Sequence, residues 1–163
     1  RCYHCKKKLF GLLLRERAAN DGFSLIIDGT NASDDAGDRP GMRALGELCV
    51  RSPLRECGLT KAEIRARSKE AGLFTWNKPA YACLATRVPT GRPIERELLQ
   101  RVEGAESELF ALGFTDFRVR LFHEAARIQL PAAQMAAALE RRGDILARLK
   151  KYFDTILLDM ETR

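Results

Sequence analysis

The chain has 163 residues and a formal net charge of +6, with 45% hydrophobic and 31% charged residues. This composition is typical of a globular protein and excludes a disordered or collagen-like chain. We find neither an apolar run long enough to span a membrane nor a signal peptide, so we expect a cytoplasmic protein. Five cysteines, an odd number, favour reduced thiols or ligands over a disulfide framework. The mild basic excess suits an anionic ligand, and without a long basic run we do not expect nucleic-acid binding.

The first part of the chain is predicted to contain helices and one buried strand. Apolar periodicity indicates a helix over residues 8–19. The apolar run 23–28 ends in a carboxylate and is predicted to be a buried strand of a parallel sheet. The polar loop 29–41 then follows the carboxyl end of that strand, where open α/β sheets bind ligands. A capping box at Thr60 predicts a further helix that ends near Ala71.

The pattern changes after Pro93. Apolar residues spaced by four and three from 98 to 112 predict a helix that ends at Gly113. Alternation over 117–122 and 126–130 predicts a β-hairpin. The remaining predicted elements are a helix that starts at Pro131, a helix capped by Gly143 and Asp144, and a strand over 155–159.

These elements predict an α/β fold with a division near residue 90. We expect residues 1–90 to form part of a doubly wound parallel sheet with its helices, and residues 91–163 to form a small α+β domain.

The segment W-N-K-P-A-Y-A-C-L-A-T-R, from Trp76 to Arg87, places one cysteine in a loop of small residues. Pro79 prevents a regular helix throughout this segment. Neighbouring cations lower the pKa of a thiol and so favour its nucleophilic thiolate. Cys83, between Lys78 and Arg87, is therefore a candidate reactive thiol. The alternative is a small buried residue without a chemical role.

Two further groups of side chains suit an anion or a metal ion. In the D-G-T-N segment at 28–31, the glycine permits close backbone approach and the next two side chains offer hydrogen bonds, although a surface turn has the same composition. Asp34 or Asp35 could bind Mg²⁺, which prefers oxygen ligands. Arg118 and Arg120 are two apart on a predicted strand, so both lie on one face, which is either an anion site or a solvated surface.

Seven motifs occur in order along almost the whole chain. They are R-C-Y-H-C-K at 1–6, D-G-T-N at 28–31 with aspartates at 34 and 35, R-P-G at 39–41, R-S-P-L at 51–54, the cysteine segment at 76–87, R-V-R at 118–120 and A-R-I-Q at 126–129. This ordered series resembles the LarE family of ATP-dependent sacrificial sulfur transferases, in the PP-loop ATP pyrophosphatase superfamily. The family's N-terminal S-G-G-x-D-S motif, which binds the ATP phosphates, is absent. We therefore expect a C-terminal fragment that is inactive alone.

The resemblance implies that ATP and Mg²⁺ activate a carboxylate of a pyridinium dicarboxylate mononucleotide. The cysteine then donates its sulfur, in the biosynthesis of the nickel-pincer cofactor of lactate racemase. A cysteine at position 83 favours this sacrificial route over an iron–sulfur cluster, which serves some family members. The family also forms homo-oligomers. The residues implied are Cys83 as the sulfur donor, Arg87, Arg118 and Arg120 for the substrate, Asp28, Gly29, Thr30, Asn31 and Arg39 for the nucleotide, and Asp34, Asp35 and Glu106 for metal ions.

Several alternatives stay open at this stage. Glu106 resembles a family glutamate linked to a divalent transition metal, but a position on the helix surface also fits its spacing. Gln129 stands where the family commonly has glutamate, and an amide is a poorer ligand for such a metal. The competing functions are a PP-loop tRNA thiolase, which needs a broad basic surface, and a non-catalytic metal-binding module. That module would use the remaining cysteines, Cys2, Cys5, Cys49 and Cys57.

Overall fold

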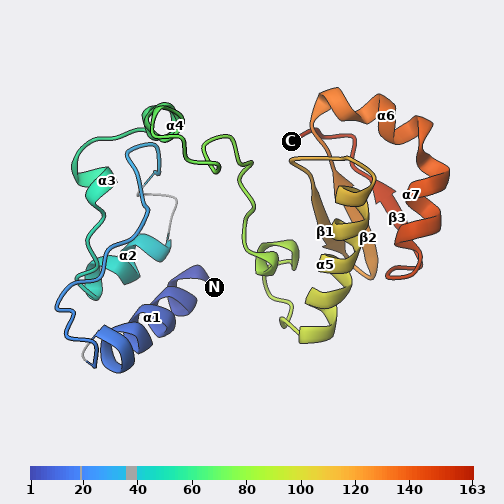
Figure 1. Cartoon of the computed structure of the whole chain (residues 1–163). Coiled ribbons are helices and arrows are strands. Elements are labelled where there is room, and N and C mark those ends of the chain that lie inside the picture. The colour runs from blue at the N-terminus through green and yellow to red at the C-terminus, as the bar shows by residue number, and fades with distance from the viewer. Residues whose placement is uncertain (19, 36–39) are drawn as a thin grey trace. The chain divides into compact units, whose positions relative to one another are not determined.

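The computed structural model describes residues 1–18, 20–35 and 40–163. They form a mixed α/β structure, in which the described part contains seven α-helices and one three-stranded sheet. The chain divides into two compact units, Arg1–Lys78 and Pro79–Arg163, which we call the N-terminal and C-terminal units (Figure 1). The domain division predicted near residue 90 stays a prediction.

The N-terminal unit is helical in its described part. Its helices are α1 (Cys2–Leu12), which continues as a π-helical turn over Leu13–Ala18, then α2 (Pro40–Glu47), α3 (Pro53–Glu56) and α4 (Lys61–Glu70). Helices α1 and α2 pack against each other. The first helix therefore begins six residues before the predicted start at Lys8. The capping box of α4 is confirmed, because Glu63 N donates to Thr60 Oγ1 and Thr60 N donates to the Glu63 carboxylate.

The predicted buried strand over residues 23–28 is wrong in extent and burial. Within this run only Ile27 pairs, in an isolated parallel bridge with Arg51. Phe23, Leu25 and Ile27 are 67%, 52% and 61% exposed. A parallel strand is buried when neighbouring strands and helices cover both of its faces. Within the described part of this unit, the bridge at Arg51 is the one strand-like partner of the run.

The C-terminal unit contains the sheet. Its elements are a 3₁₀ turn at Leu84–Arg87, α5 (Arg96–Ala111), β1 (Arg118–Phe122), β2 (Ala125–Gln129), a 3₁₀ turn at Ala132–Gln134, α6 (Met135–Glu140), α7 (Arg142–Leu149) and β3 (Ile156–Leu158). The sheet order is β1-β2-β3, with β1 antiparallel and β3 parallel to β2. The predicted hairpin and final strand are thus confirmed. The predicted cap by Gly143 and Asp144 is wrong, because α7 already begins at Arg142 and Asp144 lies in its first turn.

Helix α5 supplies much of the apolar core of the C-terminal unit. Its predicted stripe is confirmed by the burial of Leu98, Val102, Ala105 and Leu109. These side chains belong to a cluster with Val119 and Ile128 of the sheet and Leu149 of α7. Gly113 ends the helix as predicted, with a φ of +86° that suits glycine. None of the helices in the described residues has the length and hydropathy needed to cross a membrane.

Candidate functional site

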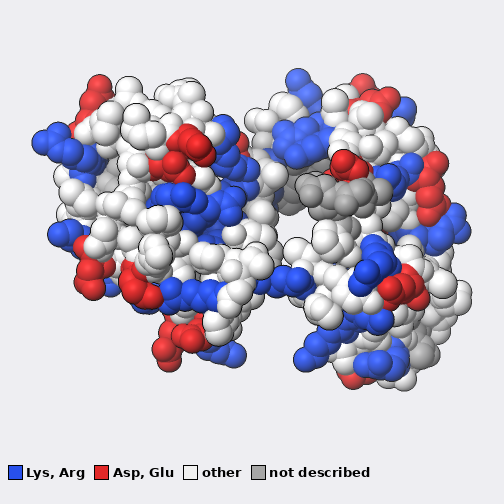
Figure 2. All heavy atoms as spheres, turned by 180° about the vertical axis from the view of Figure 1, so that it is seen from behind, with Lys and Arg blue, Asp and Glu red and all other residues white. Residues whose placement is uncertain are grey.

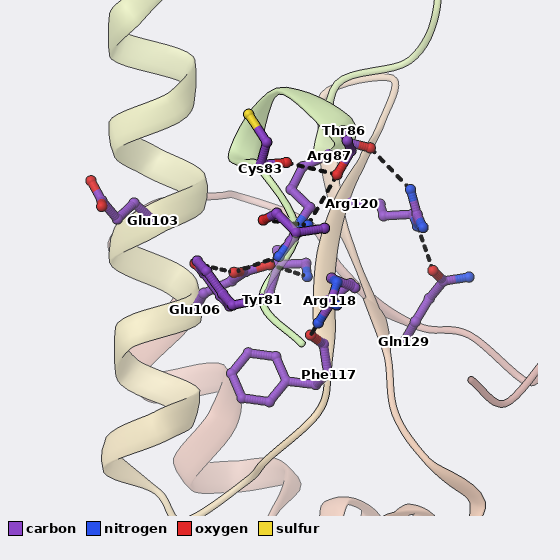
Figure 3. A network of polar contacts seen from close by, with 12 residues as sticks. Tyr81, Cys83, Thr86, Arg87, Glu103, Glu106, Phe117, Arg118, Arg120 and Gln129 are labelled. Carbon is purple, nitrogen blue, oxygen red and sulfur yellow. Dashed lines mark hydrogen bonds and ion pairs between the residues drawn. The ribbon is translucent and has the colours of Figure 1, made fainter. Parts of the chain in front are cut away.

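Cys83 lies exposed in the C-terminal unit, directly before the 3₁₀ turn. No helix or strand is assigned to residues 79–83, so side chains satisfy the carbonyl oxygens of this loop. Arg118 Nη2 donates to Ala80 O at 2.8 Å, Arg87 Nη1 to Ala82 O at 3.4 Å, and Thr86 Oγ1 to Cys83 O at 2.7 Å. The Cys83 sulfur points away from these contacts (Figure 3). The loop is therefore fixed from one side while the thiol stays accessible.

A buried ion pair lies beneath this loop. Arg87 Nε and Nη2 donate to Glu106 Oε1 and Oε2 at 2.6 and 3.1 Å. The two side chains are 0% and 1% exposed. The Tyr81 hydroxyl donates to Glu106 Oε2 at 2.6 Å, and Val119 N donates to Oε1 at 2.9 Å (Figure 3). The expectation that Glu106 lies on the helix surface is thus wrong, because the inner face of α5 carries it into the core.

The same network shifts the pKa values of neighbouring groups. Burial and the hydrogen bond to Glu106 raise the pKa of Tyr81 to about 12, so its hydroxyl remains a donor at neutral pH. Burial, followed by the charges of Arg163 and Arg87, lowers the pKa of Arg118 from its ordinary value. Burial and the charge of Arg87 act on the pKa of Arg120 in the same direction. Arginine keeps its charge even so, and the lowered pKa values reflect burial first and neighbouring cations second.

Arg118 and Arg120 both have protein partners. Arg118 is 4% exposed and also donates to Phe117 O at 2.6 Å. Arg120 donates to Gln129 Oε1 at 2.5 Å and to Thr86 O at 3.0 Å. Gln129 in turn donates to the Asp159 carboxylate at 2.8 Å. The substrate-binding roles of Arg87, Arg118 and Arg120 stay predictions.

The contacts of Glu106 do not fit a metal ligand. A carboxylate offers about four lone-pair positions, and each Glu106 oxygen already accepts two hydrogen bonds. Gln129 contributes a neutral amide to the same region. Over the described ranges of the chain, no group of three or more His, Cys, Asp or Glu side chains converges. The metal role predicted for Glu106 is therefore without support from its geometry.

In the N-terminal unit, Asp28 is the centre of a second polar cluster. Ser52 Oγ and Thr30 Oγ1 each donate to its carboxylate at 2.6 Å, Thr30 N donates at 3.2 Å, and Lys6 Nζ lies 3.8 Å away. Burial acts to raise the pKa of Asp28, but these hydrogen bonds and the Lys6 charge outweigh burial and lower it. The ionised carboxylate of Asp28 therefore holds its loop through the hydrogen bonds from Thr30 and Ser52.

A cavity of about 270 Å³ adjoins this cluster. It is lined by Cys2, Lys6, Thr30, Asp34, Pro40, Gly41 and Met42. Of the predicted nucleotide residues, Thr30 thus lies at the cavity, while Arg39 lies outside the described residues. Asn31 and Asp34 close a turn, since Asn31 N donates to Asp34 Oδ2 at 3.1 Å and Asp34 N to Asn31 O at 3.1 Å. The sequence predicted either a surface turn or a nucleotide-binding segment at 28–31. The observed turn adjoins the cavity, so the two predictions describe the same stretch of backbone.

Sequence reasoning missed the pairing of Arg87 with Glu106. The two residues are nineteen positions apart, and no helical or strand spacing connects them. It also gave no role to Tyr81 or Thr86, although both belong to the cysteine segment. The one signal in the sequence was the position of Glu106 beside the apolar stripe of α5. A carboxylate buried there would need a charged partner.

Surface charge is mixed on the face shown in Figure 2, where acidic side chains interrupt the basic ones in both units. Binding of a nucleic acid along its backbone requires a continuous basic surface. This face does not provide one.

Three proteins are similar to almost the whole chain, although no family model matches it. The chain is 39% identical to an uncharacterized protein of Synechocystis sp., over 99% of the chain and 61% of that protein. It is 37% identical to the pyridinium-3,5-bisthiocarboxylic acid mononucleotide synthase of Lactiplantibacillus plantarum, over 97% and 58%. It is 30% identical to an uncharacterized protein of Methanocaldococcus jannaschii, over 99% and 63%. The chain thus spans about three fifths of the length of the curated relatives it matches.

Proposed function

Since the chain is homologous to the LarE family over 97% of its length, we propose that it carries the sulfur donor of an ATP-dependent sacrificial sulfur transferase. The proposed substrate is a pyridinium dicarboxylate mononucleotide. This choice follows the name of the Lactiplantibacillus relative, which describes synthesis of the corresponding bisthiocarboxylic acid.

The proposed reaction uses Cys83 once. ATP adenylylates a substrate carboxylate, with release of pyrophosphate. The Cys83 thiolate attacks the acyl carbon, AMP leaves, and a thioester joins enzyme and substrate. Removal of the Cys83 Cα proton then breaks the Cβ–S bond, whose electron pair stays on sulfur. The substrate leaves as a thiocarboxylate, and residue 83 becomes dehydroalanine.

The observation that carries this proposal is the environment of Cys83. Its thiol is exposed, while side chains from β1 and from the 3₁₀ turn after the cysteine fix the backbone around it. A nucleophile gains rate when its surroundings hold it in one orientation. Arg118 and Arg120 lie on the neighbouring strand, and we propose that they meet the substrate's phosphate or carboxylate groups.

We propose that the N-terminal unit contributes to the nucleotide site. Asp28, Gly29, Thr30 and Asn31 would line it, and Asp34 and Asp35 would hold Mg²⁺. Mg²⁺ sites commonly combine one or two carboxylates with substrate phosphates, so the lack of a converging cluster among the described residues is compatible with this role. The bound ion would neutralise phosphate charge. The parallel bridge at Ile27 and the exposed apolar run beside it support a place in a doubly wound PP-loop-like sheet. Assembly as a homo-oligomer is part of the same proposal.

The test is intact-protein mass spectrometry of the protein that contains this chain, after incubation with ATP, Mg²⁺ and the dicarboxylate mononucleotide. We expect loss of the elements of H₂S at Cys83 in proportion to the thiocarboxylate formed. Cys83→Ala abolishes both signals, whereas Cys57→Ala, which removes another exposed cysteine, leaves them unchanged. Product formed without any mass change would reject the sacrificial step.

A further inference from the structure

We infer that Glu106 is a positioning residue for Cys83: it holds both ends of the cysteine loop and neutralises Arg87 beneath it. The inference deepens the proposed function and takes Cys83 as the reacting group from it. In this role both oxygens of Glu106 accept hydrogen bonds from protein donors.

Glu106 bonds to the loop on both sides of the cysteine. Tyr81 lies two residues before Cys83 and donates to Oε2, while Arg87 lies four residues after it and donates to both oxygens. Val119 N supplies the remaining hydrogen bond and ties the carboxylate to β1. One buried side chain thus connects the helix, the sheet and both ends of a loop that has no strand or α-helix of its own.

Arg87 connects the Glu106 carboxylate to the backbone of Cys83 through hydrogen bonds. Its Nη1 donates to Ala82 O and, at 3.1 Å, to Thr86 Oγ1. Thr86 Oγ1 then donates to Cys83 O. A continuous chain of contacts therefore leads from the Glu106 carboxylate to the residue whose thiol is exposed (Figure 3).

The carboxylate also neutralises the Arg87 cation beneath the loop. The charged and titratable groups around the loop include Glu103 and Glu106 on α5, Arg118 and Arg120 on β1, Tyr81 and Arg87 in the loop itself, and Arg163, whose charge acts on Arg118 and Arg120. Within this set Arg87 and Glu106 cancel each other at contact distance. Loss of the carboxylate leaves the Arg87 cation uncompensated, and an uncompensated cation favours the thiolate.

The test measures how fast iodoacetamide alkylates Cys83 as a function of pH, in the wild type and in Glu106→Gln. Peptide mapping separates Cys83 from the other four cysteines, because its tryptic peptide contains no other cysteine. We expect the midpoint of the rate profile to move to lower pH in Glu106→Gln, because the Arg87 cation is then uncompensated. Glu106→Asp, which keeps the charge, should return the midpoint towards that of the wild type.

The matched control is Glu108→Gln on the same helix. Glu108 pairs with Arg148 and Lys151 at 3.2 and 3.5 Å, away from the loop, so its removal should leave the midpoint unchanged. A residue that only stabilises the fold would lower the melting temperature without moving the profile. A folded Glu106→Gln variant with the wild-type midpoint would overturn the inference.

Tyr81→Phe provides a second measurement if Glu106→Gln does not fold. This change removes one of the four hydrogen bonds and no buried charge. We expect amide hydrogen exchange of residues 82–86 to become several-fold faster while α5 keeps its protection; equal exchange in both proteins would count against the inference. Neither measurement needs ATP or substrate. Failure of the sulfur-transfer reaction is therefore distinguishable from failure of the positioning role.

Discussion

The two units differ in how their apolar residues are used. In the C-terminal unit, seventeen buried hydrophobic residues form one cluster between the helices and the sheet. In the described part of the N-terminal unit, Ala44, Leu45 and Val50 are the buried hydrophobic residues, and Phe23 and Phe74 are 67% and 94% exposed. Polar side chains can be placed reliably only where packed elements hold them. The cysteine loop rests on such a core, whereas the Asp28 cluster depends mainly on hydrogen bonds along one segment.

The ion pairs of the two units show the same contrast. Arg87 and Glu106 are fully buried and hold the loop, while Arg51 and Glu56 in the N-terminal unit form a pair whose side chains are 61% and 38% exposed. Water screens the charges of an exposed pair, so the pair contributes little to the free energy of unfolding. A buried pair, once one partner is lost, leaves an unpaired charge in the core.

The largest effect we expect comes from Arg87→Met. This change keeps the unbranched stem of the side chain but removes the guanidinium and leaves Glu106 buried without its cation, which should lower the free energy of unfolding by about 3–5 kcal/mol. Hydrogen exchange of the α5 amides measures this free energy for the C-terminal unit. Arg51→Met is the matched control, and we expect it to leave the α5 amides unchanged and the N-terminal unit little affected. Equal small losses in both variants would show that the buried pair does not stabilise its unit.

This contrast also explains what the sequence could predict. The apolar stripe of α5, the hairpin and the capping box at Thr60 depend on local periodicity or on contacts three residues apart, and all three predictions are confirmed. The buried strand at 23–28 failed because burial depends on what covers a strand, and local pattern does not contain that information.

The candidate site divides in the same way. Cys83 could be singled out because proline, small residues and flanking cations mark its loop in a single segment. The Arg87–Glu106 pair could not be predicted, since it forms only when α5 packs beside the loop. Glu106 looked like a surface residue because glutamate is almost never fully buried without a partner, and the sequence did not reveal the partner.

A smaller effect, of opposite sign in the two units, is expected from glycine substitutions in helices. A Cβ at Gly104 of α5 would lie 2.4 Å from Tyr152 Cε1. Gly104→Ala must displace that ring at a cost of about 1–3 kcal/mol, which equals or exceeds the gain of about 1 kcal/mol in helix propensity, so we expect a net loss of stability. At Gly11 of α1 the added Cβ would meet no atom within 4 Å beyond its chain neighbours and the backbone of its own helix, so Gly11→Ala should stabilise by up to about 1 kcal/mol. Thermal unfolding of both variants checks the two signs; a stabilising Gly104→Ala would show that the ring moves freely.

The smallest effects on stability should come from changes of pH. Asp28 should act at acid pH and Tyr81 at alkaline pH. The pKa of Asp28 is lowered in the folded protein, so its contribution is complete above the ordinary aspartate value and is lost as pH falls through the folded pKa. The pKa of Tyr81 is raised to about 12, so its contribution is complete below the ordinary tyrosine value of about 10 and is lost as pH rises towards 12.

Hydrogen exchange cannot compare such distant pH values directly, so we would measure thermal unfolding from acid to alkaline pH. Asp28→Asn should reduce the fall of the melting temperature at acid pH and leave its fall at alkaline pH unchanged. Tyr81→Phe should do the reverse. Both effects are limited because neither residue is fully removed from water; Tyr81 is 48% exposed. If Tyr81→Phe left the fall at alkaline pH unchanged, its hydrogen bond to Glu106 would not contribute to folding. The contribution of Glu106 to anchoring the cysteine loop would then depend on Arg87 alone.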